Sequence, residues 1–222
     1  MARLWITRTR PAANESAQRL SAMGYDVIAA PVLEVEYNPA VLLPPEGSHL
    51  IFTSRNGVGA FAAATSLRDW PCICVGDASA DTARKAGFEN VTSAQGNAND
   101  LTAWVIAHLD KTVPLYHAAG QNPRGEIIER LRASGFSSAV RETFYGAHPV
   151  RHDPRRLTKH DDIVLLYSPM AAQALIGFDL DMTDMTVIAL SRAVDAALGD
   201  KTCKARYIAE YPREDSLFAH IP

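Results

Sequence analysis

Short apolar runs alternate with helical patterns along this chain, and the alternation limits the folds that the chain can adopt. The runs are four to six residues long and rich in β-branched side chains, as expected of strands buried within a parallel sheet. They lie at 3–7, 25–30, 49–53, 72–75, 113–117, 162–167 and 185–190. Strands that alternate with helices predict an α/β fold in which right-handed crossovers join parallel strands.

Three of the helical patterns close with a glycine. The segment 11–24 carries apolar residues spaced by three and four positions, and the segments 77–87 and 123–135 follow strand-like runs in the same way. Glycine commonly follows the last turn of a helix because it adopts a left-handed backbone conformation without steric cost. The three glycines therefore predict the ends of three helices.

Two proline-rich stretches, 31–48 and 143–162, interrupt the alternation and are expected to be extended connectors. The chain before the first stretch and the chain after the second are each too short for a core of their own. We therefore predict two parallel-sheet α/β domains in a bilobed arrangement, the second inserted in the first and joined to it by two extended linkers. Domain 1 is assigned residues 1–34 and 155–222, domain 2 residues 45–144, and the linkers residues 35–44 and 145–154.

Charge and composition exclude several classes of function. A net charge of -3 argues against a general binder of nucleic acid or of membrane surfaces. No apolar run is long enough to cross a membrane, and the apolar part of the N-terminal segment is too short for a signal peptide. The cysteines number three, which is odd and therefore favours reduced thiols in a cytosolic protein over a set of disulfides. We expect a soluble, cytoplasmic protein, and a monomer, because no apolar stripe is left over.

Small, hydroxylic or cationic residues occupy the turns at which predicted strands meet their helices. They are Thr7, Arg8 and Arg10; Thr53, Ser54, Arg55 and Asn56; Gly76 and Ser79; Gly120; Ser168 and Pro169; and Ser191 and Arg192. One explanation is helix capping, because a helix N-terminus leaves backbone N–H groups unpaired. The other is ligand binding, because parallel α/β sheets bind ligands beyond the carboxyl ends of their strands. N–H groups, hydroxyls and arginines there favour a large polycarboxylate or polyphosphate in a cleft shared by the two domains.

The signatures of other chemistries are missing from the sequence. Neither GxxxxGK[ST] nor GxGxxG, GxSxG or HExxH occurs, which argues against an unrelated enzyme of phosphorylated metabolites. His148, His152 and His160 share one connector without metal-ligand spacing, so no metal site is expected. Nothing resembles a nucleophile paired with a base. If the protein is an enzyme, we expect it to act by holding a reactive substrate in the conformation that reacts, and not by covalent attack.

The ordered turns resemble those of the uroporphyrinogen-III synthase family. The family's features appear as "ITRTRP", "FTSRNGV", "VGDASA" and "LLYSPMAA", in the expected order and over essentially the whole chain. The resemblance implies two α/β domains, with the N-terminal strand–helix–strand completing the domain built by the C-terminal part. It also implies a cofactor-free lyase of tetrapyrrole biosynthesis. Its substrate would be hydroxymethylbilane, a linear tetrapyrrole with acetate and propionate arms. The enzyme would remove water from this substrate, invert its last pyrrole ring through a spiro intermediate and close the macrocycle to uroporphyrinogen III.

The resemblance also implies roles for particular residues. The family's functional tyrosine follows the last strand of the inserted domain, where Tyr145 is the nearest match and would assist loss of the hydroxyl. The alternative for Tyr145 is packing in the linker, and Tyr167 is a second candidate. The turn residues named above would bind the substrate. The other expected partner is the preceding pathway enzyme, in a transient hand-over of the substrate.

Departures from the family pattern keep a second function open. Ser191 stands where glycine is usual and Val194 where a hydroxyl residue is usual, while Ser79 replaces a threonine. Arg192 would then supply the contacts that Ser191 and Val194 lack. The alternative function is a non-catalytic bilobed module that binds or senses a tetrapyrrole or another polycarboxylate.

Overall fold

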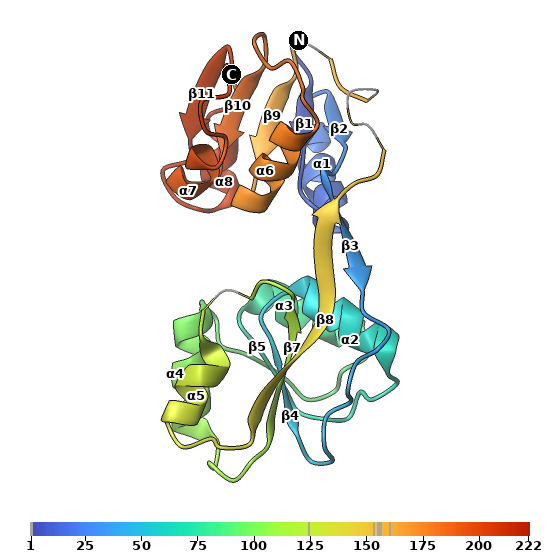
Figure 1. Ribbon diagram of the computed structural model, residues 1–222, viewed down its shortest axis with the longest axis vertical. Coiled ribbons are helices and arrows are strands. Elements are labelled where there is room, and N and C mark those ends of the chain that lie inside the picture. Colours follow the sequence, from blue (N-terminus) through green and yellow to red (C-terminus); the bar gives the residue numbers. More distant parts are fainter. Residues whose placement is uncertain (1, 124, 153, 155–156, 160) are drawn as a thin grey trace. The chain divides into compact units, whose positions relative to one another are not determined.

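The computed structural model describes residues 2–123, 125–152, 154, 157–159 and 161–222. The chain divides into two compact units (Figure 1). Met1–Glu34 and His148–Pro222 form one unit, called here the discontinuous domain, and Val35–Ala147 form the other, the inserted domain. The linker bounds 35–44 and 145–154 stay a prediction. Residue 155, the predicted start of the second segment of domain 1, lies outside the described residues.

The discontinuous domain is built on a five-stranded sheet with the order β11-β10-β9-β1-β2, in which all neighbours are parallel. Its strands are β1 (Leu4–Ile6), β2 (Val27–Ala29), β9 (Ile163–Leu166), β10 (Thr186–Ala189) and β11 (Ala205–Ile208). Its helices are α1 (Ala12–Ala22), α6 (Pro169–Gly177), α7 (Arg192–Ala196) and α8 (Glu214–Phe218).

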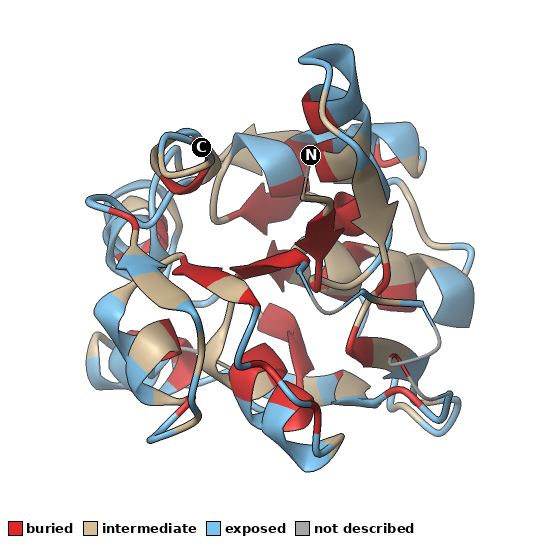
Figure 2. Cartoon of the chain, turned by 90° about the horizontal axis from the view of Figure 1, so that it is seen from above, coloured by how far each residue is buried: buried red, intermediate tan, exposed pale blue. Residues whose placement is uncertain are grey.

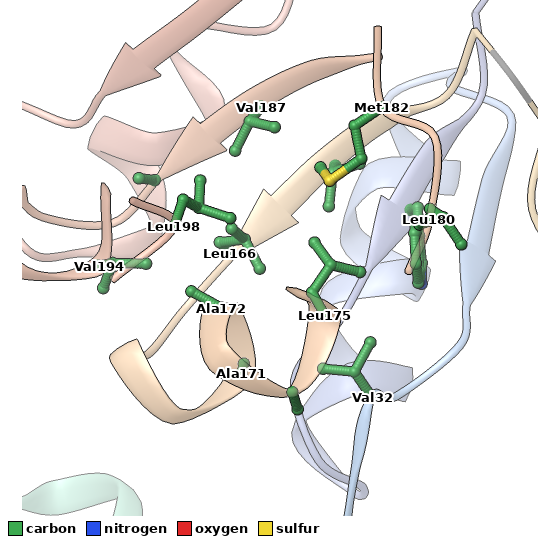
Figure 3. Packing of buried hydrophobic residues seen from close by; sticks show 14 of the residues in the cluster. Val32, Leu166, Ala171, Ala172, Leu175, Leu180, Met182, Val187, Val194 and Leu198 are labelled. Carbon is green, nitrogen blue, oxygen red and sulfur yellow. The ribbon is translucent and has the colours of Figure 1, made fainter. Parts of the chain in front are cut away.

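Alternate strand residues of this sheet pack into two separate cores. Leu166 and Val187 face α6 and α7, where they meet residues such as Leu175 and Val194 (Figure 3). The intervening strand residues pack with residues of α1 and α8 on the other face. Burial on both faces explains why the inner strands β1, β9 and β10 are mainly apolar instead of alternating, and why inner strands are among the buried elements in Figure 2, whereas the edge strands β2 and β11 are half-buried.

The inserted domain has a six-stranded sheet with the order β3-β8-β7-β4-β5-β6. Its strands are β3 (Leu33–Tyr37), β4 (His49–Phe52), β5 (Cys72–Cys74), β6 (Val91–Ser93), β7 (Leu115–Gly120) and β8 (Ala139–Pro149). Its helices are α2 (Arg55–Ala64), α3 (Asp77–Lys85), α4 (Ala98–His108) and α5 (Ile127–Ala133). The five strands from β8 to β6 are parallel. Helices α2 and α3 cover one face and α4 and α5 the other.

The predicted α/β class with parallel sheets is confirmed, and each of the seven apolar runs overlaps a strand, although β7 continues to Gly120, three residues beyond the run 113–117. The predicted helix ends are confirmed as well: Gly24, Gly87 and Gly135 have φ values of 91°, 92° and 101° directly after their helices. Strands β3, β6, β8 and β11 were not predicted. All of β3 and the end of β8 lie in stretches interpreted as connectors, and β6 and β11 are short, half-buried edge strands without a long apolar run. None of the described helices is long and apolar enough to cross a membrane.

Aromatic rings form the centre of the α2–α3 side of the inserted domain. The Phe61 ring, fully buried, lies with its centroid 5.7 Å from Phe52, 6.0 Å from Phe88 and 5.4 Å from Phe144. The Phe52–Phe61 pair meets edge to face, with 74° between the ring planes, and such pairs contribute beyond their buried area. Phe61 therefore joins helix α2 to strands β4 and β8.

We expect Phe61→Ala to lower the free energy of unfolding of the inserted domain by about 3–5 kcal/mol, since it leaves a cavity among rings that cannot collapse fully. Denaturant titration followed by domain-resolved hydrogen exchange measures the loss. Ile106→Ala is the control, because Ile106 is 41% exposed on α4 and should change stability by less than about 0.5 kcal/mol. Equal effects of the two substitutions would contradict the importance of the ring cluster.

Candidate active site

A cavity of about 550 Å³ opens at the carboxyl ends of the strands of the inserted domain. Turns after neighbouring strands and the start of α4 form its wall. The lining residues are Thr53, Ser54, Val75, Asn97, Ala98, Asn99, Gly120, Asn122, Pro123 and Tyr145. None of these described residues carries a charged side chain, so the cavity offers hydroxyl, amide and backbone groups to a ligand.

Ser54 begins helix α2 and contacts the predicted catalytic tyrosine. Its backbone is extended, and its Oγ accepts a hydrogen bond of 3.0 Å from the Gly57 N–H. The same Oγ lies 2.7 Å from the Tyr145 Oη, with either hydroxyl able to donate. The helix cap therefore fixes Ser54, and Ser54 in turn fixes the phenol at the cavity wall.

A β-bulge directs Tyr145 toward this site. Ala119 pairs with Thr143, but the next residue, Gly120, pairs with Tyr145, so two residues of β8 oppose one residue of β7. A Cβ atom at Gly120 would lie 2.7 Å from the Tyr145 Cζ and 2.9 Å from its Oη. Only glycine leaves room for the ring at this point, since real Cβ atoms do not approach so closely.

Thr53, next to Ser54, contacts a buried histidine. The Thr53 Oγ1 lies 3.0 Å from the Nε2 of His117, which is 1% exposed on β7. Burial lowers the pKa of His117 to about 4; the Arg141 charge adds to this effect and Glu129 opposes it. The imidazole is therefore neutral at neutral pH. Its Nδ1 has no hydrogen-bond partner among the described residues.

The corresponding edge of the discontinuous domain carries the other predicted residues that cap helices. The Ser168 Oγ accepts from the Ala171 N–H at 3.1 Å, with Pro169 in the first turn of α6. The Ser191 Oγ accepts from the Val194 N–H at 3.4 Å at the start of α7. The capping explanation thus holds for both serines, and Ser54 shows that capping does not prevent contact with a cavity.

Thr7 and Arg8 are already engaged within the discontinuous domain. Thr7 is fully buried and its hydroxyl donates to the Leu165 carbonyl at 2.6 Å. The Arg8 guanidinium lies 2.9 Å from a Glu214 carboxylate oxygen and 4.6 Å from the centre of the Tyr167 ring. Burial raises the pKa of the Tyr167 phenol, and the Glu214 charge adds to the rise. In this structure Thr7 stabilises the sheet and Arg8 is neutralised.

The remaining predicted residues do not line the cavity. Arg10 and Arg192 are exposed, Arg55 and Asn56 are half-buried in the first turn of α2, Gly76 precedes α3 and Ser79 is buried within it. The asparagines at 97, 99 and 122 were not predicted as site residues. The sequence holds a signal for Asn97, because Asp100 follows it three residues later and the two form a capping box at the start of α4.

A match to a model of a protein family identifies the family of this chain. The model described as uroporphyrinogen-III synthase HemD matches residues 14–219, nearly the whole chain. The chain belongs to the uroporphyrinogen-III synthase family. The predicted activity, a lyase of tetrapyrrole biosynthesis, is thereby confirmed at the level of the family.

Solved structures of the uroporphyrinogen-III synthase family share the fold. A uroporphyrinogen-III synthetase from Helicobacter pylori gives a TM-score of 0.71 at 17% identity, over 99% of this chain and 97% of that chain. A mutant uroporphyrinogen III synthase from the extremely thermophilic bacterium Thermus thermophilus gives a TM-score of 0.50 at 16% identity, over 99% and 96%. At such identities the likeness concerns the fold and not single residues. No curated protein matches the chain.

His117 gives the stability of this uroporphyrinogen-III synthase domain a dependence on pH. Between pH 6.5 and about 4 the unfolded chain binds a proton at His117 that the folded domain does not, so stability is complete above 6.5 and falls as pH falls. The expected loss is about 3 kcal/mol. His117→Gln removes this contribution, and denaturant titrations across this pH range should give a flatter curve for the variant. Parallel curves for variant and wild type would contradict the neutral, buried state of His117.

Proposed function

We propose that the cavity of the inserted domain holds the hydroxymethyl end of hydroxymethylbilane and that Tyr145 assists loss of its hydroxyl. The observation that supports this most directly is the 2.7 Å contact between the Tyr145 Oη and the Ser54 Oγ in the cavity wall. A phenol held by a second hydroxyl can give up its proton while the second hydroxyl donates to the developing phenolate. Both groups stand in a fixed geometry before the substrate arrives.

The proposed step needs one proton and no external reagent. Tyr145 donates its proton to the leaving oxygen as the C–O bond breaks, so water leaves and the pyrrole becomes an electrophilic azafulvenium cation, whose charge balances that of the phenolate. The Ser54 hydroxyl stabilises the Tyr145 oxygen, and the Gly57 N–H stabilises the Ser54 oxygen in turn. The substituted carbon of the last ring then attacks, which leads through a spiro intermediate to the inverted ring. The proton released from the pyrrole when the macrocycle forms restores the phenol.

In this proposal the other polar groups of the protein bind the carboxylate arms of the substrate. The N-termini of α2 and α4 and the amides of Asn97, Asn99 and Asn122 offer neutral donors to anions. Arg10 and Arg192 on the discontinuous domain offer exposed positive charge, and Ser168 and Ser191 offer helix N-termini. Because Glu214 already pairs with Arg8, we assign Arg8 a smaller share of substrate binding than Arg10.

We extend the proposal to the surroundings of the enzyme. All three cysteines are free thiols, which suits the reducing cytoplasm. Hydroxymethylbilane closes without ring inversion when it is left in water, so a transient hand-over from the preceding pathway enzyme would protect the substrate. Addition of that enzyme should raise the fraction of isomer III at low synthase concentration, and an unchanged fraction would contradict the hand-over.

The distinction from a non-catalytic binding module rests on the isomer formed. The purified protein is given freshly made hydroxymethylbilane, and the oxidised products are separated into uroporphyrin I and III. Predominance of isomer III supports the synthase. Isomer I alone, at the rate without protein, would support the module, for which the departures at Ser191 and Val194 are the best argument.

We expect Tyr145→Phe to slow formation of uroporphyrinogen III by about 10²–10⁴-fold with the fold intact, since it removes the proton donor and keeps the ring. Steady-state turnover and near-ultraviolet circular dichroism measure the two effects. Tyr211→Phe is the matched control, because Tyr211 is 52% exposed and distant in sequence from the cavity turns. Turnover of Tyr145→Phe at the rate of the control would remove Tyr145 from the reaction.

We expect Gly120→Ala to lower turnover by about tenfold or more, because the added methyl displaces the Tyr145 ring from its place beside Ser54. Gly177→Ala is the control, since a Cβ there meets no atom within 4 Å. The measurement is the turnover rate at saturating substrate. If the two alanine variants retain equal turnover, the position of the ring does not limit the reaction.

A further inference from the structure

We propose that His117 is a positioning residue that makes the Thr53 hydroxyl a hydrogen-bond donor toward a carboxylate arm of the substrate. The inference rests on the proposed function of the cavity. His117 itself does not line the cavity, whereas Thr53 does. The histidine therefore acts through Thr53 and not on the substrate.

The sheet brings the two residues together. Strands β4 and β7 are parallel neighbours, with Ile51 in register with His117, and Thr53 follows two residues after Ile51. His117 is buried at 1% exposure, and its Nε2 lies 3.0 Å from the Thr53 Oγ1. This contact joins a buried side chain of β7 to the turn at the cavity edge.

The position of the imidazole proton follows from the unpaired nitrogen. A neutral imidazole has one N–H group, and Nδ1 has no partner among the described residues. A buried N–H without an acceptor is rare and costly, so the proton belongs on Nε2, where the Thr53 oxygen accepts it. The Thr53 hydroxyl then has its own proton left to donate. No other hydrogen bond of the Thr53 side chain occurs within the part of the chain that the structure describes.

The two adjacent hydroxyls therefore have different tasks. Ser54 is engaged with Tyr145 and with the Gly57 N–H, and so serves the leaving group. Thr53 presents a donor, polarised by the imidazole N–H behind it, to an acceptor in the cavity. A carboxylate is an acceptor without a competing donor, which fits the acetate and propionate arms of the substrate. His117 thus affects how tightly the substrate binds more than how fast it reacts.

The kinetic test uses Thr53→Val, His117→Leu, the double variant and His117→Gln. If His117 acts through Thr53, either single substitution raises KM for hydroxymethylbilane about tenfold with kcat nearly unchanged, and the double variant is no worse than Thr53→Val alone. Glutamine carries an amide N–H at about the place of Nε2, so His117→Gln restores KM. Multiplying effects in the double variant, or a wild-type KM for His117→Leu, would overturn the inference.

A matched histidine and a spectroscopic readout separate positioning from general damage to the fold. His49 lies at the amino end of β4, away from the cavity turn, and burial lowers its pKa as well. His49→Gln should leave KM unchanged. Nitrogen NMR of the wild-type ring should show the proton on Nε2 of His117, and a proton on Nδ1 would overturn the inference even if His117→Leu fails to fold.

Failure of this inference differs from failure of the proposed function. If the wild-type protein forms only isomer I, the proposed function fails whatever the imidazole tautomer. If the wild type forms isomer III but KM does not respond to His117→Leu, the function stands and the role of His117 is wrong.

Discussion

Strand β1 holds the discontinuous domain together, because it pairs with β2 on one side and with β9 on the other. Leu4 and Trp5 in this strand are at most 1% exposed, and the Trp5 indole donates to the Ala30 carbonyl at 2.7 Å. At the start of the strand, Arg3 contacts the fully buried carboxylate of Asp162 at 2.8 Å. Breaking such a buried pair by removing one partner is costly, so the pair also fixes the register of β1 against β9. The carboxyl ends of β1, β9 and β10 then share one edge, which the turns leading into α1, α6 and α7 follow, with Ser168 and Ser191 capping the last two.

The two sheet edges favour anions in different ways. The described lining of the cavity in the inserted domain is uncharged, so an anion there meets helix N-termini, amides and hydroxyls. The edge of the discontinuous domain carries arginines, one of which is neutralised by Glu214. Binding through neutral dipoles depends less on ionic strength than binding through exposed arginines, because salt screens exposed charges most.

The sequence predicted the parts of the fold that depend on burial alone. The strands around β1 and β4 are continuously apolar because both faces are covered, and Gly24, Gly87 and Gly135 end helices because left-handed backbone suits glycine. Four strands were not predicted, for the opposite reason. Strands β6 and β11 are short and only half-buried at the sheet edges, and β3 and β8 carry polar side chains. In β3, acidic residues alternate with apolar ones, and β8 mixes charged residues with a glycine and a proline, so neither resembles a buried strand.

The site was predictable only in part. Thr53, Ser54, Gly120 and Tyr145 line one cavity, and all four were named from the sequence. Thr53 and Ser54 follow β4 as expected, whereas Gly120 ends β7 and Tyr145 lies within β8 instead of after it. The bulge that directs Tyr145 was not visible, because it depends on a register shift between β7 and β8. Nor was the partner of Thr53, since the two residues are separated by 64 positions and meet only through strand pairing.

The pairing of β1 with β9 also sets an order of events during synthesis. Leu4 pairs with Ile163, which leaves the ribosome 163 − 4 = 159 residues after it. At roughly 5–20 residues per second, β1 spends on the order of 10 s or more without its central partner. All strands of the inserted domain from β4 to β7, with their helices, emerge within that interval. The newly made chain can therefore complete most of one domain while β1 of the other, paired only with β2, still lacks β9.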